Sequence, residues 1–222
     1  SEMCIRDSYH SDDVIPGDWS CGADAATDHE PEIVMAATAP TGACLATAKI
    51  AIETDYEYFV NNDSDADATN ADITRMMMSL DLIFSSQVGV GYELTATFIW
   101  TEDVDPYVAT DIYDILSEFQ TFWNATMGGI EYDVAHMLSG KEPTTGVVGL
   151  ASVATVCRDG QNDLAYGVSL TNYTDNYALR LSLTAHELGH NWAALHCNQP
   201  SCPPDDPECT NCGICLLYTS PS

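Results

Sequence analysis

The chain has 222 residues, of which 45% are hydrophobic, so it can bury the core of one sizeable domain. Its 34 Asp and Glu residues against six Lys and Arg residues give a formal net charge of −28, which excludes nucleic acid and anionic membranes as partners. No apolar run approaches the roughly 20 residues of a membrane-spanning helix. Nine cysteines favour an oxidising, extracellular compartment.

The two ends of the chain are related at the level of their DNA. Residues 1–8 and 215–222 can be encoded by the two strands of one inverted repeat, as expected for a sequencing adapter. We therefore expect both segments to be adapter translation and exclude them from fold prediction. Residues 9–46 are rich in Asp, Ala, Thr, Gly and Pro and are expected to be a linker or the tail of a propeptide. Residues 47–214 remain as one domain.

The first half of this domain alternates between strand and helix patterns. Lys49–Asp55 predicts a strand, and the acidic segment Asn61–Asp72 predicts a loop. The loop leads into a helix with an apolar stripe that runs from Ile73 to Ile83. Tyr92–Trp100 predicts a second strand, and Pro106–Met127 has apolar residues at helical spacing.

The second half continues the alternation. Val147–Val156 and Leu164–Leu170 are apolar, β-prone runs, and the last helix is expected to start near Thr174 or Asp175 and to run through His190. Strands that alternate with long helices predict an α/β fold with a mixed, mostly parallel, twisted sheet.

Asp63, Asp65 and Asp67 are spaced like calcium ligands. An EF-hand loop needs glycine at its sixth position and an acidic ligand at its twelfth, and Ala68 and Thr74 stand there instead. We expect a solvated, helix-capping loop, and a Ca²⁺ site is the alternative. The isolated His136 is expected to be a structural or a surface histidine.

The segment His186-Glu187-Leu188-Gly189-His190, followed by His196, carries the strongest functional signal. Residues four apart on a helix differ by only about 40° in azimuth, so His186 and His190 are expected on one face, where two imidazoles can hold a zinc ion. Glu187 is placed beside them to touch a metal-bound water. His196 can be a third ligand if the helix breaks, and three protein ligands leave one position open for catalysis.

This motif resembles that of the metzincin zinc endopeptidases, H-E-x-x-H-x-x-G-x-x-H followed by a methionine turn. Two further segments, Tyr132–Gly140 and Val148–Cys157, resemble the reprolysin or adamalysin-like branch, and the similarity runs from Lys49 to Ile214. It implies a metzincin-like catalytic domain whose active-site helix carries the motif. Residues 47–214 would then be that domain, truncated before its methionine turn.

The resemblance implies one catalytic Zn²⁺ held by His186, His190 and His196, with Glu187 as the general base for attack by zinc-activated water. It also implies an edge strand at Gly149–Ala151, including Leu150, that pairs with a protein or peptide substrate. The expected protein is secreted and carries flanking domains. This chain differs from the family pattern at Ala193, where the family has the glycine at which the backbone turns. Alanine in that turn is expected to be strained by about 1 kcal/mol or more.

Cysteines crowd the chain near and after the motif. We expect disulfides among five of them, and a structural zinc bound by the last four is the alternative: Cys157, Cys197, Cys202, Cys209 and Cys212. Cys21 is either another disulfide cysteine or a propeptide thiol that occupies the open zinc position.

Two rival functions remain beside a secreted zinc endopeptidase. One is a non-catalytic binding or adhesion module that retained the fold, which the intact His186, Glu187, His190 and His196 disfavour. The other is a zinc hydrolase of a non-peptide substrate, which the extended motif and the edge strand disfavour.

Overall fold

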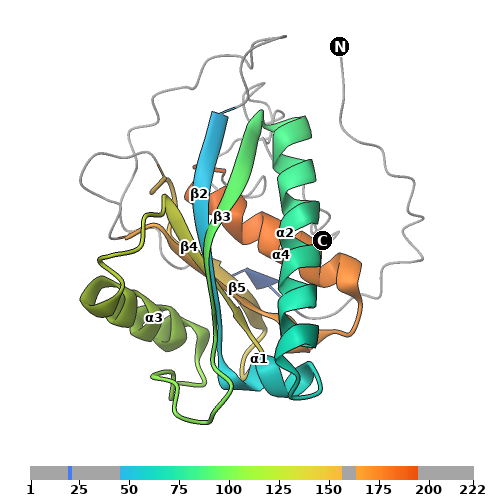
Figure 1. Cartoon of the computed structure of the whole chain (residues 1–222), viewed down its shortest axis with the longest axis vertical. Helices are drawn as coiled ribbons and strands as arrows, with labels where there is room; N and C mark the ends of the chain where they lie inside the picture. The colour runs from blue at the N-terminus through green and yellow to red at the C-terminus, as the bar shows by residue number, and fades with distance from the viewer. Residues whose placement is uncertain (1–19, 22–45, 157–163, 195–222) are drawn as a thin grey trace.

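The computed structural model describes residues 20–21, 46–156 and 164–194. In these residues a six-stranded sheet lies between α3 on one face and α2 with α4 on the other (Figure 1). The predicted α/β class and mostly parallel sheet are confirmed. None of the described helices is both long enough and apolar enough to cross a membrane.

Eleven elements follow one another along the described chain. In order they are β1 Ser20–Cys21, β2 Ala46–Thr54, α1 Tyr56–Asn61, α2 Ala66–Gln87, β3 Val90–Ile99, α3 Ile112–Thr126, β4 Val134–Ser139, β5 Val147–Ala151, β6 Tyr166–Leu170, the 3₁₀ turn η4 Thr171–Tyr173, and α4 Tyr177–Asn191.

The strand order in the sheet is β1-β5-β6-β4-β2-β3. Every neighbouring pair is parallel except β5 and β6, which are antiparallel with Gly149 opposite Ser169 and Ala151 opposite Gly167. The central strands β4 and β6 are buried along their whole length. Parallel strands covered by helices on both faces have this continuous burial.

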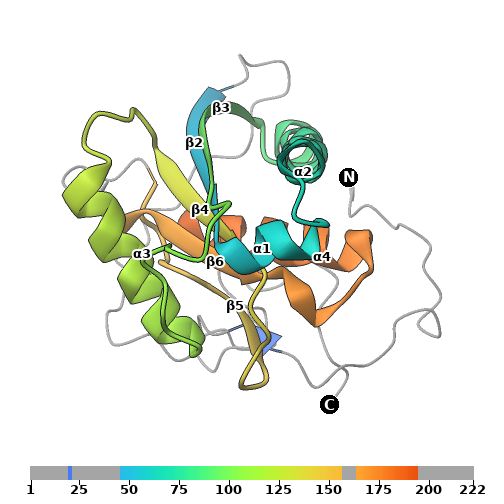
Figure 2. The same ribbon diagram turned by 60° about the horizontal axis from the view of Figure 1, so that its bottom comes forward.

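Each face of the sheet packs against its own hydrophobic core. On one face, α2 and α4 cover Ile50, Ile52, Val134 and Leu138 of β2 and β4. On the other face, α3 and the preceding loop contribute a set of buried aromatic and aliphatic side chains: Tyr107, Ile112, Ile115, Leu116, Phe119 and Trp123. Figure 2 shows α3 and α2 on opposite sides of the strands.

Several element boundaries differ from the prediction. Helix α2 begins at Ala66, inside the segment expected to be a loop, because the Asp65 side chain accepts hydrogen bonds from the amides of Asp67 and Ala68. The expected capping role of the acidic segment is thereby confirmed. Helix α3 begins only at Ile112, capped by Asp111. The short helix α1 and the strand β4 had not been predicted as separate elements.

A buried carboxylate, Asp55, organises the end of β2. It caps α1 by accepting from the amide of Tyr58 at 2.8 Å, and it also accepts from the amide of Gly140 at 2.8 Å and from the hydroxyl of Ser139. Burial raises the pKa of Asp55 to about 6. The start of α1 is therefore tied to the end of β4, 84 residues further along the chain.

Candidate active site

Helix α4 carries the histidine motif, as predicted. Its N-cap is Asn176, whose side chain accepts from the amide of Ala178, so the helix starts slightly later than Thr174 or Asp175 would allow. The helix runs to Asn191 and brings His186 and His190 onto one face. The ring centroids of the two histidines are 4.5 Å apart and their planes are perpendicular.

The two imidazoles converge on a single point. The Nε2 atoms of His186 and His190 are 3.0 Å apart. Two nitrogens that bind one tetrahedral zinc ion at 2.0–2.1 Å are expected to lie about 3.3 Å apart, so the pair needs little adjustment to share a metal. Imidazole nitrogens are also donors that suit zinc.

The hydrogen bonding of His190 favours the tautomer that a metal requires. Its Nδ1 lies 2.7 Å from the carbonyl oxygen of Ala194, which can only accept. Nδ1 must therefore carry the proton and donate it, which in the neutral ring leaves the lone pair on Nε2. A hydrogen bond from the second ring nitrogen to a carbonyl is the usual orienting contact of a metal-binding histidine.

The carbonyl of Ala194 is in place because α4 ends in a Schellman motif. The amide of Ala194 donates to the carbonyl of Gly189 at 3.0 Å, and the amide of Ala193 donates to that of His190 at 2.9 Å. Ala193 has φ = 72°, the left-handed conformation that glycine adopts freely. The chain thus makes the turn of the glycine pattern with an alanine, at a cost in conformational strain.

Glu187 lies between α4 and the sheet, and its side chain is fully buried. Its carboxyl group rests against the backbone of Gly149 in β5: a Cβ atom placed on Gly149 would lie 2.6 Å from Cδ of Glu187. Leu183, one helical turn earlier, makes a similar approach, with Cδ1 at 2.7 Å from that position. The acid beside the histidines therefore faces the strand that is expected to bind substrate.

Asn191, which was not singled out from the sequence, joins α4 to the turn that follows β5. Its buried amide nitrogen donates to the carbonyls of Ser152 at 2.9 Å and Tyr166 at 3.1 Å. Its backbone carbonyl accepts from the backbone amides of Thr155 and Val156 at 3.0 and 3.1 Å. The hydrogen bonds of this one residue thus hold the histidine helix to the turn after the expected substrate strand and to the neighbouring strand β6. Nothing in its residue type signals this role.

The outer edge of β5 is paired with β1 in the described residues. The two strands are parallel, and Cys21 lies opposite Gly149. Gly149, Leu150 and Ala151 are thus held by β6 on one side, and Gly149 is covered by β1 on the other. The segment expected to be linker or propeptide tail therefore reaches the expected substrate strand.

The remaining predicted site residues lie outside the described part of the chain. These are His196 and the five cysteines expected in disulfides, and of Cys21 only the backbone is described. Among residues 20–21, 46–156 and 164–194, no group of three or more His, Cys, Asp or Glu side chains could hold a metal ion. The described part contributes the pair His186 and His190 to the expected set of three.

Of the two roles expected for His136, structural or surface, the structure shows the structural one. It is completely buried in β4, and its Nε2 lies 2.9 Å from the hydroxyl oxygen of Ser169 in β6. Burial without a compensating charge lowers the pKa of His136 to about 3, so the ring is neutral at physiological pH.

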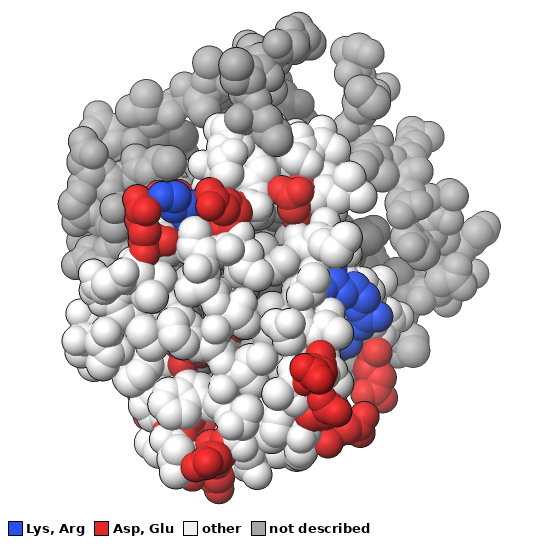
Figure 3. Space-filling model, in the orientation of Figure 1, with Lys and Arg blue, Asp and Glu red and all other residues white. Residues whose placement is uncertain are grey.

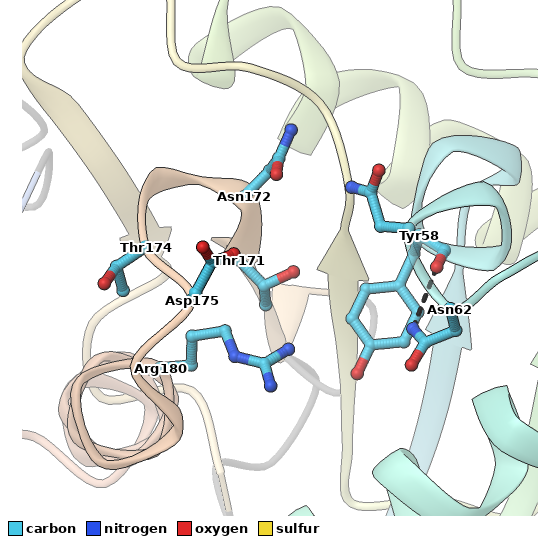
Figure 4. Close-up of a pocket in the computed structure, with 8 residues that line it drawn as sticks. Tyr58, Asn62, Thr171, Asn172, Thr174, Asp175 and Arg180 are labelled. Carbon is cyan, nitrogen blue, oxygen red and sulfur yellow. Dashed lines mark hydrogen bonds between the residues drawn. The ribbon is translucent and has the colours of Figure 1, made fainter.

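A polar pocket of about 140 Å³ lies between α1, η4 and the start of α4 (Figure 4). Arg180 projects into it and donates to Asp72 at 3.2 Å, and the same carboxylate accepts from the hydroxyl of Tyr58 at 2.8 Å. Arg180 precedes His186 by six residues, about 9 Å along the helix axis. The pocket is therefore separate from the histidine site and contains none of the predicted site residues.

The basic side chains of the described residues are all engaged by carboxylates. Lys49 pairs with Glu131, Lys141 with Glu57, and both Arg75 and Arg180 with Asp72. On the face shown in Figure 3, the visible basic groups lie beside acidic ones, and other acidic side chains stand alone. The described surface thus has no unpaired basic patch.

A reprolysin family model described as metallo-peptidase family M12 matches residues 45–222. The chain belongs to this family. Family M12 consists of enzymes that hydrolyse peptide bonds, in agreement with the class of motif on α4. The resemblance seen in the sequence is thereby confirmed at the level of the family.

Curated relatives agree with this assignment. The chain is 26% identical over 148 residues to mouse disintegrin and metalloproteinase domain-containing protein 19, covering 67% of this chain and 16% of that protein. It is 31% identical over 140 residues to rat disintegrin and metalloproteinase domain-containing protein 1, covering 61% of this chain and 16% of that protein. It is 26% identical over 171 residues to zinc metalloproteinase-disintegrin-like brevilysin H2a of Gloydius brevicauda, covering 76% of this chain and 38% of that protein. The chain thus spans well under half the length of these relatives.

A solved structure supports the fold alone. A chain in the structure of a chaperone-substrate complex matches with a TM-score of 0.53 and 14% sequence identity, covering 70% of this chain and 25% of that one.

Proposed function

We propose that this domain is the catalytic domain of a secreted zinc endopeptidase that cleaves protein substrates. The observation that carries the proposal is the convergence of the Nε2 atoms of His186 and His190, 3.0 Å apart, with the buried Glu187 between them in sequence. The hydrogen bond from Nδ1 of His190 to Ala194 supports the metal-binding tautomer.

His186, His190 and His196 are the proposed ligands, and Glu187 is the proposed general base. A bound zinc ion would supply Lewis-acid activation of water and of the scissile carbonyl. Glu187 accepts the proton of the attacking water and passes it to the leaving amine. Its burial against Gly149 keeps bulk water away from the carboxylate and fixes its position on the helix.

The substrate is an extended peptide that pairs with the main chain of β5. Strand addition supplies hydrogen bonds that do not depend on the substrate's side chains. Gly149, Leu150 and Ala151 lie on the strand whose Gly149 is packed against Glu187, so a peptide bound there passes the proposed base. This geometry favours an endopeptidase over a hydrolase of small non-peptide molecules.

Cys21 is proposed as a thiol that keeps the enzyme latent. Support comes from β1, which pairs with β5 so that Cys21 lies opposite Gly149, whose backbone contacts Glu187. A thiolate at this place can take the open zinc position. Cys21→Ser should give a protein that cleaves substrate without prior processing, whereas wild-type protein retaining residues 9–46 should need processing. Equal activity of the two unprocessed proteins would contradict the latent role.

The export of the protein is part of the same proposal. We assign Cys157, Cys197, Cys202, Cys209 and Cys212 to disulfides, and flanking domains to the parent protein, since the chain spans 16–38% of the relatives above. Thiol labelling before and after reduction distinguishes disulfides from a second, structural zinc. Labelling of these cysteines without reduction, enhanced by a chelator, would favour the metal.

Metal analysis and one substitution test the function. Purified parent protein should hold one zinc ion per chain that a strong chelator removes along with activity. Glu187→Gln should retain zinc and fold but lower kcat on a protein substrate by about 10³-fold, because only proton transfer is lost. Zinc-free active protein, or full activity of the variant, would contradict the proposal. Undetectable cleavage by wild-type protein that binds zinc and unmodified peptides would support the non-catalytic binding module instead.

A further inference from the structure

Helix α4 lies against small residues on the two strands beneath it. Gly149, Ala151, Gly167 and Ser169 form two cross-strand pairs, Gly149 with Ser169 and Ala151 with Gly167. The residues between them, Leu150 and Val168, belong to the core on the opposite face. Because strand residues alternate between faces, the four small residues face α4.

Gly149 contacts the proposed base. A Cβ atom there would lie 2.6 Å from the carboxyl carbon of Glu187 and 2.7 Å from Cδ1 of Leu183. Real Cβ atoms essentially never approach another heavy atom within 3.0 Å, so any larger residue must displace the carboxyl group or the helix. Glu187 is fully buried and has no solvent-filled space into which it could move freely.

The backbone conformation does not explain the glycine. Gly89 is the described glycine with positive φ, and Gly149 lies outside the left-handed region. Alanine would therefore be acceptable to the backbone at position 149, and glycine weakens a strand relative to alanine. A glycine within a strand often marks a close approach by another group, and here that group is Glu187.

We propose that Gly149 is a positioning residue whose missing side chain forms the seat for the Glu187 carboxylate and so sets its distance from the metal and the attacking water. This inference rests on the proposed function of Glu187. It assigns Gly149 a role beyond pairing its main chain with substrate. Misplacement of a catalytic group by about 1 Å can lower a rate by about 10²-fold.

Gly149→Ala should therefore lower kcat by about 10²-fold while KM changes by less than threefold, because the main-chain groups that pair with substrate remain. The zinc content should stay at the wild-type level. Gly167→Ala is the matched control. It adds a methyl group on the same face, where the three nearest atoms belong to His136, with Nδ1 at 2.7 Å, and to Ala151, with Cβ at 3.3 Å, and not to Glu187. Its folded fraction should keep a near wild-type kcat.

Leu183→Ala separates the two contacts made at position 149. If Gly149 only accommodates helix packing, the double variant Gly149→Ala/Leu183→Ala should recover kcat relative to Gly149→Ala. The proposal expects kcat to remain low, because the carboxylate is still displaced. This double variant also serves if Gly149→Ala alone does not fold.

A stability cycle gives a readout that needs neither metal nor turnover. In metal-free protein, Gly149→Ala should lower the Tm of the otherwise wild-type chain. The same substitution should lower the Tm less when Glu187 is already replaced by alanine, and this reduction should be greater than the one seen when Leu183 is replaced by alanine. Wild-type kcat in Gly149→Ala, equal losses in Gly167→Ala, or additive Tm shifts with Glu187→Ala would each overturn the proposal. Failure of the proposed function would appear separately, as an active Glu187→Gln enzyme or as active protein without zinc.

Discussion

At strands β5 and β6, the two faces of the sheet differ in the size of the residues they offer to the helices. The face under α3 offers Tyr166, Val168 and Leu170, which pack with the aromatic rings of Phe119 and Trp123. The face under α4 offers glycine, alanine and serine at the β5 and β6 positions between them. Large residues fill volume and stabilise the fold, whereas small ones bring Glu187 into contact with a strand backbone. At these two strands the sheet therefore supports stability on one side and the proposed chemistry on the other.

A substitution on the aromatic side should cause the greatest loss of stability. Phe119 is completely buried, with ring centroids 5.6 Å from Trp123 and 5.4 Å from Tyr166. Phe119→Ala should lower the free energy of unfolding by about 4 kcal/mol, because the cavity is lined by rings that cannot collapse into it. Denaturant unfolding measures this loss. The half-buried Phe122 on the same helix provides the control, and Phe122→Ala should lower the free energy of unfolding by clearly less. The kcat of folded Phe119→Ala should stay within twofold of the wild type, and a tenfold fall would show that this face also positions the site.

His136, on the α4 side of the sheet, should make the stability of the fold depend on pH. Its folded pKa of about 3 lies below the usual value of 6.5, so the neutral ring stabilises the fold above pH 6.5. This stability is lost as the pH falls from 6.5 towards 3, because the unfolded chain binds the proton first. At pH 5 the loss is about 2 kcal/mol.

His136→Gln keeps a group that can hydrogen-bond Ser169 but does not titrate. The difference in unfolding free energy between wild type and variant should therefore change by about 2 kcal/mol between pH 7 and pH 5. Asp55 has the opposite sign: its pKa is raised to about 6, so its contribution grows as the pH falls from 6 to 3.8. For this reason the difference between variants, and not the total pH profile, is the test. A constant difference would show that the His136 ring binds its proton as readily in the folded as in the unfolded chain, which would contradict the lowered pKa.

The smallest expected effect concerns the end of α4. Ala193→Gly should raise the free energy of unfolding by about 1 kcal/mol, since glycine adopts φ = 72° without strain. Ala71, exposed within α2, is the control, and Ala71→Gly should lower stability by about 1 kcal/mol. Thermal unfolding of both variants provides the measurement. If both substitutions lower the free energy of unfolding, the prediction is wrong, and the surroundings of Ala193 relieve the strain of its positive φ.

The parts of the fold that follow from local pattern could be predicted from the sequence. The long helices, the strand pattern and the histidine spacing are periodic features, and α4 carries His186 and His190 where the spacing placed them. The six-residue helix α1 was missed because its cap, Asp55, is held by Ser139 and Gly140, more than 80 residues away. Strand β4 reads as a short apolar run with a histidine in it, a pattern that does not distinguish a buried strand from other core segments.

The contacts that complete the site could not be predicted. Asn191 and Gly149 act through groups on other elements: Asn191 through Ser152 and Tyr166, and Gly149 through Glu187. Residue type and spacing carry no record of such partners. The Ala193 turn was expected to be costly, and the structure adopts the costly conformation because the Schellman hydrogen bonds that close α4 require it.

The hydrogen bonds of Asn191 make the helix end and the turn after β5 one cooperative folding unit. Segments that share several buried hydrogen bonds open and close together in the native state. Fraying of α4 at Asn191 would release the amides of Thr155 and Val156 in the same event, and with them the end of the proposed substrate strand. Damaged molecules should therefore lose metal and peptide binding together. We therefore expect no partly unfolded form that still captures a substrate which it can no longer cut.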